Sequence, residues 1–154
     1  AVVCLTAVVA IGGVSAPASA KSKGYVFKYK GVSVTMNGAA KKLIKKAGKP
    51  SKKTVKKSCA YKGKDRTYTY KDFQLKTYSK TNNGAEYVSE IRFRSNKAVT
   101  KEGIRIGSSL KDVTKKYGKA KARFGVYTFK KGSSKLQIML NGNKVSAIRY
   151  FASK

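Results

Sequence analysis

One six-residue segment occurs twice in this chain. Val88-Ser89-Glu90-Ile91-Arg92-Phe93 returns near the C-terminus as Val145-Ser146-Ala147-Ile148-Arg149-Tyr150. Self-similarity of this kind constrains the fold more than any single motif does. It constrains the function less, because a duplicated sheet unit provides a binding surface and no chemistry of its own.

The pattern that precedes each copy is repeated as well. Val34-Thr35-Met36 comes before a helical pattern that ends at Gly48, and Ile104-Arg105-Ile106 comes before one that ends at Gly118. We therefore predict an α+β fold made of two tandem helix-plus-antiparallel-strands units, with both helices on one face of the sheet.

The first twenty residues are typical of a secretory signal peptide. Residues 1–20 contain no charged residue and end in Ala18-Ser19-Ala20, which predicts cleavage before Lys21. A transmembrane anchor is the alternative, but glycines and Pro17 leave the continuous apolar part short of the roughly 20 residues that a span needs. We expect a secreted protein, either extracellular or associated with the cell envelope.

The remainder, 21–154, has the length of a single domain, here composed of two repeats at about 25–96 and 99–152. The chain carries 36 basic residues against six acidic ones, a net charge of +30, which favours contact with polyanions. Thirty of the basic residues are lysines, whereas specific phosphate recognition favours arginine. This predicts diffuse attraction to an anionic cell-wall polymer or membrane surface; codon usage in an AT-rich genome is the alternative source of the lysines.

Hydrophobic periodicity predicts the elements and their faces. We expect a hairpin at 25–34, helices ending at Gly48 and Gly118, a basic loop at 49–57, and strands at 57–61, 66–71, 73–79, 87–94, 124–130, 135–141 and 144–151. The predicted core-facing residues of the sheet are Phe73, Leu75, Ile91, Phe93, Leu136, Ile138, Leu140, Ile148 and Tyr150.

Little in the chain suggests catalysis. It has no histidine, its six carboxylates are scattered, and no phosphate-binding glycine loop of the required spacing occurs. Cys59 lies on an alternating pattern that predicts a buried, apolar role, with a reactive thiol as the alternative. We expect no enzyme and no catalytic, cofactor or metal site; a lysine of lowered pKa in a deep pocket would be the exception.

The solvent face of the sheet is the candidate binding site. Three of the six arginines fall on it by strand parity, next to exposed aromatic residues, a composition found in protein-binding hot spots and stacking platforms. An ordinary half-solvated sheet with a basic outer face is the alternative. The residues of this predicted partner-binding face are Lys76, Tyr78, Arg92, Arg94, Met139, Arg149 and Phe151.

The motif Gly-Ile-x-Ile-Gly-Ser-Ser-Leu-x-x-Val-x-x-x-Tyr-Gly at 103–118, together with the repeated unit, resembles the β-lactamase-inhibitor-protein-like family, whose fold is shared with SmpA/OmlA-type outer-membrane assembly lipoproteins. The stretch from Ser58 to Tyr78 is similar to small secreted proteins and lipoproteins of clostridia-like Gram-positive bacteria. The resemblance covers most of 32–151 and implies that the sheet face with Arg92, Arg94 and Arg149 binds a protein target. The chain departs from the inhibitor in lacking its paired disulfide cysteines and in being more basic.

These observations favour a non-catalytic secreted protein that associates with the cell envelope through anionic polymers. A protein-binding or inhibitor module that uses the sheet face is the first alternative, and extracellular nucleic-acid binding is the second. Secretion argues against an intracellular nucleic acid as the partner.

Overall fold

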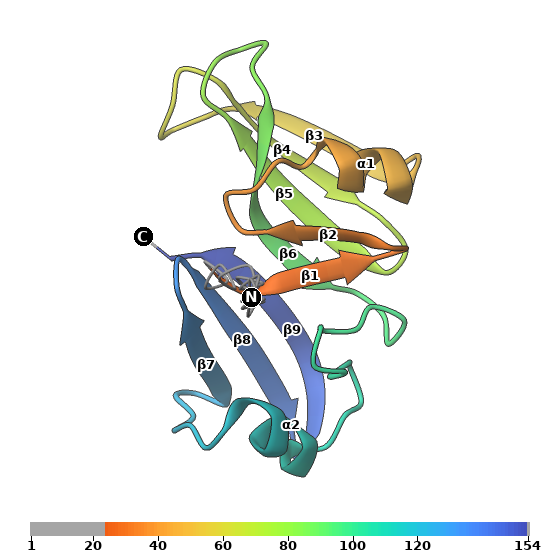
Figure 1. Cartoon of the computed structure of the whole chain (residues 1–154), viewed down its shortest axis with the longest axis vertical. Helices are drawn as coiled ribbons and strands as arrows, with labels where there is room; N and C mark the ends of the chain where they lie inside the picture. The colour runs from red at the N-terminus through yellow and green to blue at the C-terminus, as the bar shows by residue number, and fades with distance from the viewer. Residues whose placement is uncertain (1–23, 154) are drawn as a thin grey trace, which may run out of the picture.

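A computed structural model describes residues 24–153, so the expected signal peptide at 1–20 lies outside the described residues. This part of the chain forms nine strands and two short helices (Figure 1). Their bounds are β1 Val26–Tyr29, β2 Val32–Thr35, α1 Lys41–Ala47, β3 Lys52–Lys57, β4 Lys64–Thr69, β5 Phe73–Ser79, β6 Glu86–Phe93, α2 Leu110–Tyr117, β7 Val126–Lys131, β8 Ser134–Asn141 and β9 Lys144–Ala152.

The predicted α+β fold of two tandem helix-plus-strands units is wrong, because antiparallel sheet dominates the described chain. The helices have only seven and eight residues. Each buries a single side chain completely, Leu43 in α1 and Val113 in α2. The strands supply most of the core instead, so the helices are attachments to a sheet rather than half of each unit.

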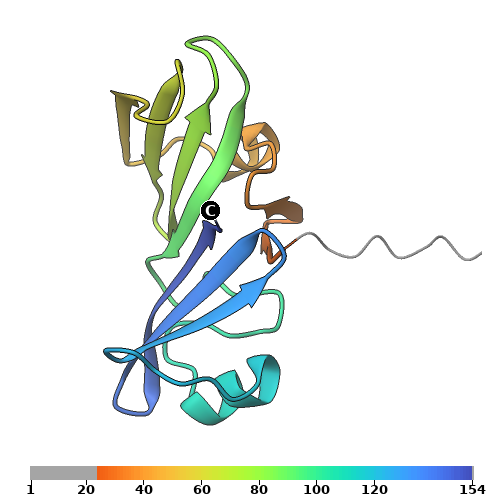
Figure 2. The same ribbon diagram turned by 90° about the vertical axis from the view of Figure 1, so that its left-hand side faces the viewer.

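Seven strands form one antiparallel sheet in the order β3-β4-β5-β6-β9-β8-β7, and β1 pairs with β2 in a separate hairpin. The two copies of the repeated segment, in β6 and β9, are therefore neighbours in the middle of the sheet. Ile91 lies opposite Tyr150, and Arg92 lies opposite Arg149. Figure 2 shows α1, α2 and the β1–β2 hairpin on the same side of the sheet. We call the other side the outer face.

A short segment before each helix bonds to the repeated strand in the same way. Asn37 donates its backbone N–H to the carbonyl of Val88 at 2.7 Å, and Gly107 donates to that of Val145 at 2.8 Å. In return, each valine donates its backbone N–H to the carbonyl of the residue that follows Asn37 or Gly107, at 2.9 and 2.8 Å respectively. These bonds satisfy the part of β6 and of β9 that the pairing between the two strands leaves free.

The core lies between the sheet and the elements on its inner side. Phe27 of β1 is fully buried and meets an aromatic ring from three strands of the sheet. The centroid of its ring lies 5.3 Å from that of Phe73, 5.6 Å from that of Phe93 and 6.4 Å from that of Tyr150. The hairpin thereby covers the junction between β6 and β9.

Most predicted strand faces are confirmed. All of the predicted core-facing residues are buried except Leu140, which is partly buried and packs against the core. The basic segment predicted as a loop at 49–57 instead contains β3, an edge strand that covers no core and so needs no apolar alternation. Cys59, predicted to be buried, is exposed in the connection between β3 and β4. Phe124, predicted to begin a strand, lies in a turn before β7.

Neither helix of the described residues has the length and apolar character needed to cross a membrane.

Replacing Phe27 with alanine removes the ring that joins the hairpin to the sheet junction. We expect Phe27→Ala to lower the free energy of unfolding by about 3–5 kcal/mol, as buried phenylalanine truncations do. Urea denaturation followed by circular dichroism measures this loss. Val55→Ala, at a half-exposed position on edge strand β3, is the control and should change stability by less than about 1 kcal/mol. Equal losses in the two variants would show that the hairpin does not support the sheet.

Candidate functional site

A single carboxylate gathers three cations in the centre of the outer face. Glu90 lies 3.2 Å from the amine of Lys76, 3.5 Å from the guanidinium of Arg92 and 3.7 Å from that of Arg149. The Glu90 side chain is only 13% exposed, whereas the three cations are between 37% and 49% exposed. We call these four residues (Lys76, Glu90, Arg92 and Arg149) the Glu90 cluster; its three cations and one carboxylate give a net charge of +2.

The side chain of Phe151 orients Arg149. The guanidinium carbon of Arg149 lies 4.6 Å from the centroid of the Phe151 ring, and the amine of Lys135 lies 5.9 Å from the same centroid. Both distances are typical of cation–π contacts. Since the 3.7 Å separation between Arg149 and Glu90 is longer than a hydrogen bond, the ring and the charge hold this guanidinium in place without a bidentate pair.

Two shallow hollows flank Arg149 on the outer face. The larger has a volume of about 560 Å³ and is lined by Lys76, Tyr78 and Phe151 among others. The smaller, of about 180 Å³, is lined by Arg92 and Met139 among others. Arg149 borders both hollows, which makes it the central residue of this surface.

Three tyrosines form a stack at one end of the larger hollow. Tyr78 lies parallel to Tyr61, with centroids 5.0 Å apart, and its ring is 5.5 Å from that of Tyr87. Burial raises the pKa of Tyr78 above its usual value, and the neighbouring phenols of Tyr61 and Tyr87 raise it further. Tyr78 therefore stays neutral at physiological pH and offers a flat ring beside the cations of the Glu90 cluster.

The structure brings together most, but not all, of the predicted partner-binding face. Six of its seven residues line one or both hollows. Arg94 does not, because it follows the end of β6 and donates to the backbone carbonyl of Tyr70 at 2.6 Å. Arg94 thus stabilises the turn between β4 and β5.

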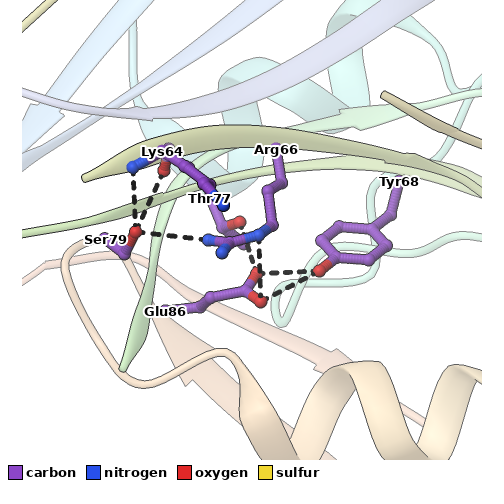
Figure 3. Close-up of polar contacts among 6 residues, drawn as sticks. All are labelled: Lys64, Arg66, Tyr68, Thr77, Ser79 and Glu86. Atoms are coloured by element: carbon purple, nitrogen blue, oxygen red, sulfur yellow. Dashed lines mark hydrogen bonds and ion pairs between the residues drawn. The ribbon is translucent and has the colours of Figure 1, made fainter. Parts of the chain in front are cut away.

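A second charged group lies on the inner side of the sheet (Figure 3). Glu86 pairs with Arg66 at 3.6 Å and accepts a hydrogen bond from the Thr77 hydroxyl at 2.7 Å. The Tyr68 hydroxyl donates to the Glu86 carboxylate, 3.0 Å from Oε1 and 2.9 Å from Oε2. Burial and the hydrogen bond to Glu86 raise the pKa of Tyr68. Arg66 also donates to Ser79 at 3.2 Å. These contacts join side chains of three neighbouring strands, so the group holds β4, β5 and β6 against each other.

Several of these residues escape prediction from the sequence. Glu90 becomes central only because a bulge between Lys76 and Thr77 places it opposite Lys76. Tyr61 lies in the connection between β3 and β4, where strand parity gives no direction. Counting residues along both strands from the Asn82-Asn83-Gly84 turn would pair Lys76 with Glu90 only if the position of the bulge were known.

No protein-family model, no curated protein and no solved structure matches this chain. The chemistry of the site therefore rests on its residues. Exposed cations held beside aromatic rings, around one carboxylate that is already neutralised, suit the binding of anionic groups or of acidic and aromatic side chains.

Replacing Glu90 with glutamine tests whether this carboxylate is needed among its cations. We expect Glu90→Gln to lower the free energy of unfolding by about 1 kcal/mol at low salt, and salt to reduce the loss because it screens the repulsion among half-exposed cations. Urea denaturation at low and high salt measures both. Asp65→Asn removes the same charge from an exposed site on β4, and a matching effect there would show that Glu90 acts only through net charge.

Proposed function

We propose that this protein is a secreted, non-catalytic binding protein held at the cell envelope by attraction of its lysines to anionic polymers. The observation that carries the proposal is that most of its few carboxylates are engaged within the protein. In the described residues, ion pairs involve Glu86 and Glu90 and include a single lysine, Lys76. Asp112 completes the capping box of α2 by accepting from the N-cap Ser109, and Glu102 accepts a hydrogen bond from Tyr117 at 2.7 Å.

The remaining lysines are spread over the molecule. Helix α1 exposes four of them on the inner side of the sheet, and edge strand β3 exposes four more at one end of it. A charge distributed in this way favours attraction without a fixed orientation, as expected for a polymer with regularly spaced phosphates. The two groups of four are Lys41, Lys42, Lys45 and Lys46 in α1, and Lys52, Lys53, Lys56 and Lys57 in β3.

Diffuse attraction predicts that the position of a removed charge is unimportant. We expect glutamine substitution of either group of four lysines to lower the salt concentration that releases the protein from teichoic-acid-containing cell walls, and by similar amounts. The native protein should be released well below about 1 M salt, where screening acts within about 3 Å. Co-sedimentation with isolated walls over a salt series measures the release point.

Retention of the native protein at about 1 M salt would contradict the proposal, because screened charges cannot hold it there. A strong effect of one group of lysines with none of the other would replace diffuse attraction by a defined site. A triple variant, Lys119→Gln with Lys121→Gln and Lys130→Gln, provides a further exposed group from another part of the surface.

The outer face supports a second candidate, a protein-binding or inhibitor module. Guanidinium groups and tyrosines concentrate here beside two hollows, which is the composition of binding hot spots. The resemblance to the β-lactamase-inhibitor-protein-like family implies the same use of a sheet face. This candidate differs from polymer attraction in requiring particular residues.

Arginine truncation separates the two candidates. If the outer face binds one protein, Arg92→Ala and Arg149→Ala should each weaken its capture by about tenfold or more, the effect of losing a hot-spot residue. Pull-down from the envelope fraction of the producing cell, with quantitation of the captured protein, measures this. Arg105→Ala removes an equal charge from an exposed site before α2 and should leave capture unchanged. Equal weakening by all three variants would favour diffuse attraction.

A further inference from the structure

The turn before β7 presents a phenylalanine fully to solvent. Arg123 and Val126 exchange two backbone hydrogen bonds of 3.0 Å each, so Phe124 and Gly125 form the two central residues of a tight turn. The exposure of Phe124 is 102%, more than that of any other large apolar residue described. Its side chain therefore contributes nothing to the core.

The backbone of Phe124 is also unfavourable. Its φ is 52° and that of Gly125 is 73°, so both central residues lie in the left-handed region, as in a type I′ turn. Glycine tolerates this region, but an aromatic residue does so at a cost, and asparagine is the residue that such turns favour at the first position. Phe124 thus has an unfavourable backbone conformation and also exposes its apolar ring to water. Selection for stability alone does not explain a phenylalanine at this position.

The turn adjoins the outer face. The chain that leaves α2 passes to the side of the sheet away from the helices before it enters β7 (Figure 2). Val126, two residues after Phe124, pairs with Met139, which is 46% exposed. Both line the smaller hollow together with Arg92 and Arg149. Apolar side chains and guanidinium groups therefore lie on the same surface.

Three basic residues precede Phe124 in the sequence. Lys119, Lys121 and Arg123 are all exposed in the segment between α2 and β7. The only carboxylate of α2 and this segment is Asp112, which accepts from the N-cap Ser109 in the capping box of the helix. The positive charge beside Phe124 is left without a neighbouring negative charge on the same segment.

We propose that the Phe124 turn docks the protein on an anionic lipid surface, with the ring of Phe124 inserted among the acyl chains and the nearby cations on the headgroups. A bilayer interface offers this combination, an apolar layer directly beneath a layer of negative charge. A soluble polyanion offers the charge alone and would leave the exposed ring unexplained. The inference rests on the proposed attraction to envelope anions and adds the lipid and the inserting residue.

Tryptophan fluorescence tests the insertion directly. The chain contains no tryptophan, so Phe124→Trp introduces a single reporter at the tip of the turn. With vesicles of phosphatidylglycerol and phosphatidylcholine, we expect its emission to shift to shorter wavelength and to be quenched by brominated acyl chains. With soluble polyphosphate, we expect binding without either change.

Removing the ring should weaken vesicle binding while preserving the fold. Phe124→Asn gives the turn the residue that it favours, so the urea midpoint should stay the same or rise. Its partitioning onto phosphatidylglycerol vesicles should fall by about 10- to 100-fold, the contribution of one buried aromatic side chain. Val55→Thr removes a half-exposed apolar side chain from β3, away from the turn, and should leave partitioning unchanged.

The outcomes separate this inference from the proposed function. Bound protein whose tryptophan emission does not shift, or equal partitioning of Phe124→Asn and native protein, overturns the insertion while leaving the attraction to anions intact. Binding to polyphosphate but not to the vesicles has the same meaning. Failure to bind either polyphosphate or vesicles overturns both.

Discussion

The rest of the structure depends on the pairing of β6 with β9. This contact has three residue pairs, and it joins four strands on one side to three on the other in a single sheet. The two strands carry the same repeated segment and run antiparallel, and in the register that they adopt one position of the repeat lies opposite its own equivalent. That position is occupied by Arg92 and Arg149. Like charges directly opposite each other destabilise a sheet, and the carboxylate of Glu90 beside them offsets part of this repulsion.

The two halves of the outer face have diverged around this pair. Where β6 has Glu90, the equivalent position of β9 is Ala147, so one side of the arginine pair has a carboxylate and the other does not. The side with Glu90 has a carboxylate among its cations and leads to the tyrosine stack. The side with Ala147 is the smaller hollow, where guanidinium groups meet Met139 near the Phe124 turn. A repeat that forms a symmetrical junction thus supports two chemically different surfaces.

Strand parity predicts the faces of the sheet well, because burial on one side imposes a period of two, as at Phe73 and Leu75 in β5. It fails where no core imposes a pattern. The sequence of edge strand β3 is typical of a basic loop, and that of the turn that exposes Phe124 is typical of the start of a strand. The importance of Glu90 depends on a bulge, which changes the register locally and leaves no mark in composition. The sequence overestimates the helices because a short amphipathic pattern does not reveal that only Leu43 or Val113 of each helix is fully buried.

The placement of the carboxylates bears on the origin of the lysines. A net charge of +30 opposes folding through self-repulsion, and each additional surface carboxylate would relieve it. The carboxylates that the chain retains are mostly at positions where the fold needs them: Glu86 beside partly buried Arg66, Glu90 at the arginine pair, and Asp112 at the start of α2. An AT-rich genome explains abundant lysine codons, but aspartate and glutamate codons are also rich in A and T and would not be depleted. The scarcity of carboxylates elsewhere on the surface is therefore the pattern that selection for the proposed attraction to anions would produce.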